Sequence, residues 1–467
     1  MKILLIRPEP PQYTIGLKNI MVCEPLELEY VAAGLEGHEV EIMDMIFESD
    51  LTGKLRSFNP DVVGTSSYIT GIRNALKICQ VTKQLNDKIL TLVGGVHASL
   101  VPEDFEDPFV DLVVCGEGIF QMQRIMERFA NGSTYEGIPG VLVSGKRDDA
   151  NESREYLSVH ARELPFPRRD LVSRHSQKYY YLFHQPVSLV KTVFGCPFKC
   201  SFCYCWKLTD GKVFLRPEES VAQELKQIPT KEVYFIDDTF LVSPNRVMKL
   251  HDLIKDFQKN YLIYGHTDFI IKHPDLIRDW AKIGLKACIV GLESPRDDEL
   301  DNYHKQTTVE KNNRAISILR KNKVDVYASF IVDPTWGKKD FALLKEYIRE
   351  QKLYYVVIQP LTPLPGTDLF ETYRDKLVIP REMHELWDMQ HVLMEPDLPL
   401  KNYYSEIRKI YLSTFFNIGR TRNLQLRTVP SVWSPDYWRL LSGCLKIYMD
   451  LRNAHTHPAK LAKQLNS

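Results

Sequence analysis

The sequence has no surplus of charge, because 60 lysine and arginine residues stand against 60 aspartate and glutamate residues. Non-specific binding to nucleic acid needs a surplus of cations, so we expect no nucleic-acid partner. Hydrophobic residues make up 44% of the chain and charged residues 26%, which excludes a disordered protein and allows a sizeable core. The length of 467 residues predicts about three domains.

Long hydrophobic runs and distributed cysteines are also missing. No stretch of about 18 uncharged apolar residues occurs, so we expect no transmembrane helix. The apolar run at positions 3–6 is too short for a signal peptide and predicts a buried strand of a parallel sheet. Three of the nine cysteines lie between positions 196 and 203, and Cys205 follows. A secreted disulfide scaffold would spread its cysteines, so we expect a cytoplasmic protein with one metal or cluster site.

The first 130 residues or so alternate apolar strand-like runs with helical patterns, which predicts a parallel sheet of βα units. The expected strands are residues 2–7, 39–43, 61–64, 89–93 and 111–114. Ligands of open α/β sheets bind at the carboxyl ends of strands. One small-residue loop there would be an ordinary tight turn, but three at corresponding places favour a cofactor site. Its expected wall residues are Ser66, Gly94, Gly95, His97, Ala98, Gly116 and Glu117.

A second βα series begins at Val187. Its expected strands are residues 187–194, 232–236, 262–265, 287–290, 324–332 and 354–359, separated by helices that include residues 244–259. Six units of about 30 residues fit a partial (βα)6 barrel better than a complete eight-fold one. We therefore expect an α/β protein with a Rossmann-like domain over residues 1–140, a linker over 141–185, the barrel over 186–385 and a small helical region over 386–467.

The expected helical region carries two aromatic stripes at helical spacing. The first comprises Tyr403, Tyr404, Ile407, Ile410, Tyr411, Phe415 and Phe416, and the second comprises Trp433, Tyr437, Trp438, Leu441 and Tyr448. Most such stripes belong to a hydrophobic core. The functional alternatives are a wall around a large apolar substrate and contact with a membrane surface.

Cys196, Cys200 and Cys203 follow the first strand of the second series with the spacing C-x3-C-x2-C. Three thiolates on one loop can hold three irons of a [4Fe–4S] cluster and leave one iron without a protein ligand. Such an open iron allows a cluster to bind and reduce a small molecule. The alternative is structural zinc with Cys205 as fourth ligand, although structural zinc usually pairs two separated knuckles.

The cysteine motif, with Phe202 before its last cysteine, is similar to the signature of the radical S-adenosylmethionine (SAM) superfamily. Residues 234–240, 291–294 and 363–367 also resemble that superfamily in its cobalamin-dependent branch. The first domain resembles the cobalamin-binding domain of that branch at residues 24–26, 94–98 and 116–118. The resemblance covers roughly residues 1–400.

The first domain departs from the cobalamin motif Asp-x-His-x-x-Gly, because the loop at residues 8–13 contains no histidine. The branch commonly lacks this motif, and the resemblance implies cobalamin bound without a protein histidine on cobalt. We expect His97 only as a wall residue of the cofactor site.

The resemblance implies an enzyme with a [4Fe–4S] cluster, SAM and cobalamin. It implies that Cys196, Cys200 and Cys203 hold the cluster and that Phe202 lies near the adenine of SAM. It also makes Asp238 and Glu293 candidates for binding the ribose or amino group of SAM, with strand-end capping or ion pairing as the alternative. For Asp237 we expect this alternative, strand-end capping or an ion pair.

The implied reaction is methylation of an unactivated carbon through a 5′-deoxyadenosyl radical and methylcobalamin. Residues 330–337 and 387–392 resemble hopanoid ring methylases and bacteriochlorophyll C-methyltransferases, which implies a large, mostly apolar, lipid-like or tetrapyrrole substrate. An electron donor such as flavodoxin or ferredoxin and peripheral membrane contact are the implied partners. The alternatives are an oxidative cyclase of the anaerobic magnesium-protoporphyrin ester cyclase type and a zinc-stabilised cobalamin sensor without catalysis.

Replacing single cysteines tests the cluster against the zinc site. Cys203→Ala should abolish formation of deoxyadenosine, because one iron loses its ligand, while Cys205→Ala should keep the cluster. Chromatography of the reaction mixture measures deoxyadenosine, and metal and sulfide analysis of anaerobically purified protein measures the cluster. Loss of iron in Cys205→Ala would favour the alternative site with four cysteine ligands. Stoichiometric zinc without iron or sulfide would reject both enzymatic alternatives.

Overall fold

The computed structural model describes residues 1–16, 20–145, 161–420 and 433–465. The chain forms two compact units, the first from Met1–Thr14 and Glu24–Gln177 and the second from Ile15–Cys23 and Lys178–Ser467. The linker predicted over residues 141–185 contains the later change of unit, and its charged part, residues 146–155, lies outside the described residues. The sequence pattern does not indicate that residues 15–23 belong to the second unit.

The first unit is an α/β domain around a six-stranded sheet of order β3-β1-β4-β5-β6-β7. Its strands are β1 (Lys2–Arg7), β3 (Glu39–Asp44), β4 (Val62–Ser66), β5 (Leu90–Gly94), β6 (Leu112–Val114) and the antiparallel edge strand β7 (Val141–Val143). The central strands are mostly apolar and buried along most of their length, because helices cover both faces of a parallel sheet. This confirms the predicted Rossmann-like domain.

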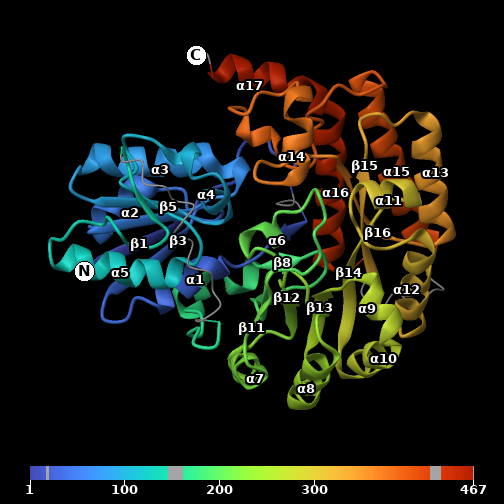
Figure 1. Cartoon of the computed structure of the whole chain (residues 1–467), viewed down its shortest axis with the longest axis horizontal. Coiled ribbons are helices and arrows are strands. Elements are labelled where there is room, and N and C mark those ends of the chain that lie inside the picture. Colours follow the sequence, from blue (N-terminus) through green and yellow to red (C-terminus); the bar gives the residue numbers. More distant parts are fainter. Residues whose placement is uncertain (17–19, 146–160, 421–432, 466–467) are drawn as a thin grey trace. The chain divides into compact units, whose positions relative to one another are not determined.

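Five helices connect these strands: α1 (Leu26–Ala33), α2 (Leu51–Phe58), α3 (Ile72–Leu85), α4 (Val96–Leu100) and α5 (Gly118–Ala130). Helices α1 and α5 pack together on one face of the sheet, and α2 and α3 pack together on the other (Figure 1). The strand order reverses between β1 and β4, and in such sheets ligands bind beyond the carboxyl ends of the strands at this point.

The second unit contains six parallel strands in the order β16-β15-β14-β13-β12-β9, which confirms the predicted partial (βα)6 barrel. The strands are β9 (Val187–Val190), β12 (Glu232–Phe235), β13 (Asn260–Tyr264), β14 (Leu285–Glu293), β15 (Asp325–Val332) and β16 (Tyr355–Pro360). The strand predicted over residues 187–194 is wrong beyond Val190. Residues Val193–Phe194 form a separate strand, β10, that pairs antiparallel with β11 (Phe214–Leu215).

Helices follow the barrel strands and cover their outer face (Figure 1). The covering helices are α7 (Glu218–Gln227), α8 (Pro244–Ile254), α9 (Thr267–Lys272), α10 (Pro274–Ile283), α12 (Val309–Lys321) and α13 (Lys338–Glu350). The short helices α6 (Cys205–Leu208), α11 (Asp297–Asn302) and α14 (Asp368–Tyr373) lie in loops that follow strands. The helix predicted over residues 244–259 ends early, at Ile254. Proline at the first position of α8 and α10 suits a helix start, because that position has no intrahelical use for an N–H group.

The inner face of the barrel is filled by tyrosines rather than left open. Tyr181 lies on β8 (Tyr180–Tyr181), which pairs with β2 (Met21–Val22). Strand β2 belongs to the inserted segment, Ile15–Cys23, which is part of the second unit. Its ring centroid lies 4.8 Å from that of Tyr234 and 6.0 Å from that of Tyr327. The hydroxyl of Tyr234 donates to that of Tyr264 at 2.7 Å. The segment at residues 15–23 thereby helps to close the interior of the barrel.

Within the described residues, the C-terminal region contains the helices α15 (Leu400–Arg420), α16 (Pro435–Asn453) and α17 (His457–Leu465). The first aromatic stripe packs α15 into the core, where Tyr403 is buried and donates to the carbonyl of Val332 at 2.9 Å. The side chains of Phe415 and Phe416 lie outside the described residues. The second stripe is not buried, because Trp438 of α16 is 59% exposed. No helix within the described ranges is both long and apolar enough to cross a membrane.

Candidate functional site

The cysteine loop lies at the carboxyl end of the barrel, directly after β10. Gly195 precedes Cys196 and has a φ of +85°, which favours glycine. A Cβ atom on Gly195 would lie 2.2 Å from the carbonyl oxygen of Lys212 and 2.3 Å from Oγ1 of Thr209. The loop therefore turns back against residues 209–212 in a way that no other residue type at this position allows.

Two adjacent carboxylates at the end of β12 fasten the chain that enters this loop. Asp237 is buried and accepts the backbone N–H groups of Thr192 and Val193 at 2.5 and 2.9 Å. Burial raises the pKa of Asp237, and the nearby Lys191 ammonium and the bonds from Thr192 oppose that rise. These bonds end β9 and explain why the predicted longer strand divides. Asp237 thus caps the strand end, which is one of the two roles expected for it.

Asp238, predicted as a SAM contact, accepts the N–H of Gly195 at 2.7 Å and the ammonium of Lys191 at 2.9 Å. Burial lowers the pKa of Lys191, but the Asp238 and Asp237 carboxylates together outweigh this effect and the pKa lies above its usual value. Asp238 therefore holds the first residue of the loop in place and keeps a cation beside it.

Further contacts brace the far side of the loop. The N–H of Ser201 donates to the carbonyl of Tyr303 at 3.1 Å, and the N–H of Leu369 donates to the carbonyl of Ser201 at 2.9 Å. The indole N–H of Trp206 donates to the carbonyl of Cys200 at 3.0 Å. The ring of Phe198 stacks on His266 with 3.8 Å between centroids. Elements after several barrel strands therefore determine the position of the cysteines.

The environment of the thiols suits metal binding rather than free thiolates. Burial raises the pKa of Cys196 to about 12 and that of Cys200 to about 11, so cationic iron would compensate the charge of these ligands. A hydrogen bond from Cys205 lowers the pKa of Cys203. In the described part of the chain, no group of three histidine, cysteine, aspartate or glutamate side chains is close enough together to hold a single metal ion. The ligands of a four-iron cluster bind separate irons, which three thiols on one loop can do.

Glu293 lies beside the cysteine loop and binds Lys305, a residue that the sequence pattern does not single out. The ammonium of Lys305 lies 2.8 Å from Oε1 of Glu293, and both side chains are largely buried. It also lies 5.8 Å from the ring centroid of Phe202. Burial lowers the pKa of Lys305, but Glu293 and Cys200 outweigh it and the pKa lies above its usual value.

Gly291 leaves room for this ion pair. A Cβ atom there would lie 2.0 Å from Oε1 of Glu293 and 2.6 Å from Nζ of Lys305. The strand also changes register between Gly291 and Glu293, and Glu293 has a φ of +60°. This irregularity at the end of β14 gives the carboxylate its position, so the structure brings Phe202 and Glu293 together through Lys305.

In the first unit, the predicted cofactor residues lie on three loops that are hydrogen-bonded to one another. The N–H of Ser67 donates to the carbonyl of Gly94, and the N–H of His97 donates to the carbonyl of Ser67. The N–H of Gly116 donates to Oγ of Ser99 at 2.8 Å. The carboxyl ends of β4, β5 and β6 therefore form one continuous edge.

The backbones of the loops after β4 and β5 lie so close together that they leave no room for a side chain at Gly95. Gly95 has a φ of +102°, and a Cβ atom there would lie 2.9 Å from the backbone nitrogen of Ser67. Ser66 donates to the carboxylate of Glu27 at 3.1 Å, and Glu117 accepts the N–H of Ile119 at the start of α5.

His97 and Ala98 are buried behind this edge. The Nε2 atom of His97 lies 2.7 Å from a carboxylate oxygen of Asp104, and the carbonyl of Ala98 accepts the thiol of Cys115 at 3.2 Å. Tyr68, which the sequence pattern does not single out, is 62% exposed beside Ser67. A flat apolar ligand at this edge would therefore meet small residues and the Tyr68 ring.

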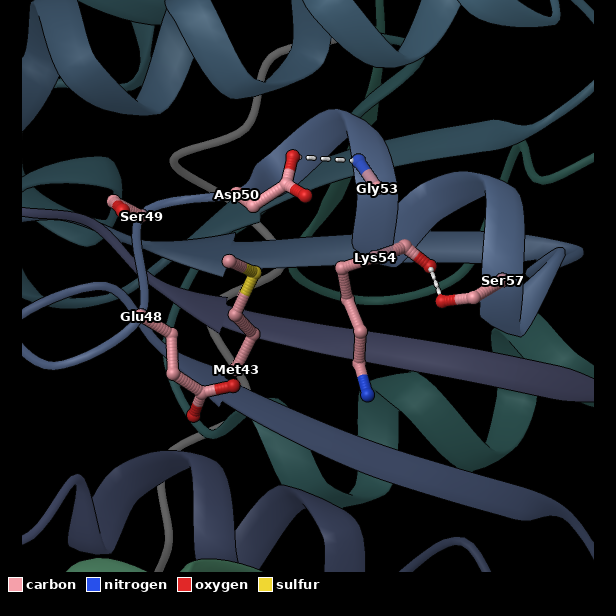
Figure 2. A pocket seen from close by; sticks show the side chains of 7 residues that line it. All are labelled: Met43, Glu48, Ser49, Asp50, Gly53, Lys54 and Ser57. Carbon is pink, nitrogen blue, oxygen red and sulfur yellow. Dashed lines mark hydrogen bonds between the residues drawn. The ribbon is translucent and has the colours of Figure 1, made fainter.

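A pocket of about 470 Å³ lies elsewhere in the first unit, between the end of β3 and the start of α2 (Figure 2). It is lined by Met43, Glu48, Ser49, Asp50, Gly53, Lys54 and Ser57. Asp50 accepts the N–H of Gly53 at 2.8 Å, Lys54 pairs with Glu41, and Glu48 lies 2.8 Å from Nε2 of His175. Its charged groups are engaged with protein partners, and none of the predicted cobalamin residues lines it.

Comparison with known families matches both units. Residues 16–121 match the B12 binding domain, and residues 190–348 match the radical SAM superfamily. The two matches contain every predicted cofactor residue in the first unit and the cysteine loop, Asp238 and Glu293 in the second.

The curated hopanoid C-3 methylase of Methylococcus capsulatus is 27% identical over 419 residues, which cover 88% of this chain and 79% of that protein. The bacteriochlorophyllide d C-8(2)-methyltransferase of Chlorobaculum tepidum is 22% identical over 454 residues, covering 91% of this chain and 93% of that protein. The solved structure of the cobalamin-dependent S-adenosylmethionine radical enzyme OxsB covers 99% of this chain and 80% of its own with a TM-score of 0.69. Its 15% identity shows likeness of fold.

The turn at Gly195 should be necessary for the cluster. Gly195→Ala should lose most of its iron and sulfide after anaerobic reconstitution, because the new methyl group overlaps the backbone of Lys212. Gly211→Ala is the matched control: Gly211 also has a positive φ, but its Cβ would meet only the flexible side chain of Lys199 at 3.5 Å. Equal iron contents in the two variants would contradict this role of the turn.

Proposed function

We propose that the chain is a cobalamin-dependent radical SAM methyltransferase that methylates an unactivated carbon of a large, mostly apolar substrate, a hopanoid-type lipid or a tetrapyrrole. The observation that carries the proposal is a cysteine loop braced on both sides and bordered by a buried cation, Lys305. The named methylases that match most of the chain support methyl transfer and the substrate class.

In this proposal Cys196, Cys200 and Cys203 ligate the cluster. When bound, the cluster and SAM supply one-electron cleavage of a carbon–sulfur bond, and cobalamin supplies the methyl group. The protein holds the thiolates through Gly195 and Asp238 and excludes water from the buried part of the loop. Exclusion of water strengthens each electrostatic contact in such a site.

Lys305 and Glu293 carry the charges that recognise SAM in this proposal. SAM has a carboxylate and an amino group, which need one cationic and one anionic partner. Lys305 supplies the first charge beside Cys200, and Glu293 supplies the second. Phe202, whose ring lies beside Lys305, contacts the adenine in this proposal. In this proposal Asp238 contacts SAM and also has an indirect effect. It holds Lys191 and the N–H of Gly195, and thereby positions the cysteine loop to which SAM binds.

We assign cobalamin to the edge formed by Ser66, Gly94, Gly95, Gly116 and Glu117, with His97 and Ala98 behind it. His97 binds Asp104 and is 4% exposed, so it supports the wall rather than offering a cobalt ligand. The partners we propose are a low-potential electron donor of the flavodoxin or ferredoxin type and a membrane surface.

Labelled SAM tests the reaction. Cluster- and cobalamin-loaded protein, incubated anaerobically with methyl-labelled SAM and either a hopanoid or a magnesium tetrapyrrole, should give a product that carries the label. Mass spectrometry separates methylation from oxidative cyclisation, since a cyclase product loses hydrogen and gains no labelled carbon. Cys203→Ala is the inactive control. A product without label would reject methyl transfer and favour the cyclase.

Lys305 should be required for binding SAM. Lys305→Met should weaken SAM binding by roughly tenfold or more, because a charge-assisted contact is lost and Glu293 remains buried without its cation. Lys305→Arg, which keeps the charge, should bind more tightly than Lys305→Met. Equilibrium dialysis on cluster-loaded protein measures both affinities. Wild-type affinity in Lys305→Met would remove Lys305 from the SAM site.

A further inference from the structure

Helix α16 leaves large apolar side chains in solvent along one face. Trp438, Leu445 and Met449 are 59%, 57% and 45% exposed, and Trp433, just before the helix, is 90% exposed. At 100° per residue, the three helical positions fall within about 40° of one another. An isolated exposed leucine needs no explanation, but a contiguous apolar face with exposed tryptophan marks an interaction surface.

The charges on α16 are arranged around this face. Lys446 and Arg452 are exposed and flank the apolar positions, whereas Asp436 and Asp450 lie on the other half of the helix at 100° per residue. Asp436 also pairs with Arg439 at 2.7 Å. The face is therefore apolar at its centre and cationic at its margins. A helix of this kind lies in the plane of a membrane interface and is attracted to anionic headgroups.

The direction of α16 within the second unit suits such contact. Helix α15 runs antiparallel to the strands, because Tyr403 binds the carbonyl of Val332 at the end of β15 and Tyr411 binds the N–H of Ile358 within β16. Helix α16 returns towards the carboxyl ends, since Arg439 near its start donates to the carbonyl of Leu182 at the opposite end. The helix axis therefore follows the strands.

We propose that this face of α16, defined by Trp438, Leu445 and Met449, is a docking surface for a bilayer that contains anionic lipids. With α16 lying in the interface, the barrel strands run along the membrane. The carboxyl edge with the cysteine loop then opens beside the bilayer. The inference locates the membrane contact proposed above and is independent of which reaction is catalysed.

Vesicle binding of the full, cofactor-loaded chain tests the surface. Wild type should sediment with vesicles of phosphatidylcholine and phosphatidylglycerol more than with phosphatidylcholine alone, and added salt should weaken the binding. Trp438→Ser/Leu445→Ser should lower partitioning by roughly tenfold or more, because tryptophan and leucine supply most of the interfacial insertion. Lys446→Glu/Arg452→Glu should remove the preference for phosphatidylglycerol.

The matched control is Met248→Ser/Leu253→Ser on α8, where the side chains are 51% and 37% exposed, and it should bind vesicles as wild type does. Unchanged iron content and thermal unfolding in every variant separate loss of docking from loss of fold. Absence of wild-type binding, or an equal loss in the α8 control, overturns the proposal. A wild-type dimer that Trp438→Ser/Leu445→Ser converts to monomer also overturns it in favour of a second copy. The labelled-methyl experiment is unaffected by any of these results.

Discussion

The candidate site depends on two neighbouring carboxylates at the end of β12. Asp237 and Asp238 together accept three backbone N–H groups from residues 192–195 and one lysine ammonium. Carboxylates can satisfy several donors at once, and such charge-assisted bonds are strong where water is excluded. They end the first barrel strand, turn the chain at Gly195 and place the cysteines at the carboxyl edge. The other contacts stabilise a loop whose path Asp237 and Asp238 determine.

Much of the fold follows from the sequence because parallel strands buried on both faces are apolar throughout. The strand predicted at residues 2–7 has those bounds in the structure, and each barrel strand lies where an apolar run predicts it. The cysteine spacing likewise predicts that three thiols share one loop after the first barrel strand, and they lie on the loop between β10 and α6. Features that depend on distant residues were not predictable in this way. Lys305 acquires its importance only when Glu293 and Phe202 approach it, and residues 15–23 show no pattern that indicates their partner strand.

The aromatic stripes of α15 and α16 illustrate the same limit. Both have apolar residues at helical spacing, and periodicity indicates that one face is apolar without indicating what covers it. In α15 the face meets β15, β16 and α13, and Tyr403, Tyr404 and Ile407 are buried. In the stripe of α16, Trp438 and the preceding Trp433 are exposed, and Tyr437, Leu441 and Tyr448 are only half-buried. The exposed tryptophans, not the periodicity, distinguish the two helices.

The inserted segment at residues 15–23 gives the chain an unusual order of assembly. The N–H of Ile15 donates to the carboxylate of Asp388 across 373 positions of sequence, and Met21 pairs with Tyr181. Contacts between such distant positions form late because the loop between them must first be closed. The Met21–Tyr181 pair can form once residues up to 181 are available, whereas the Ile15 contact must wait for Asp388. A fragment beginning at residue 186 would lack part of its own interior, so the catalytic barrel is not a module that can be separated from the N-terminus.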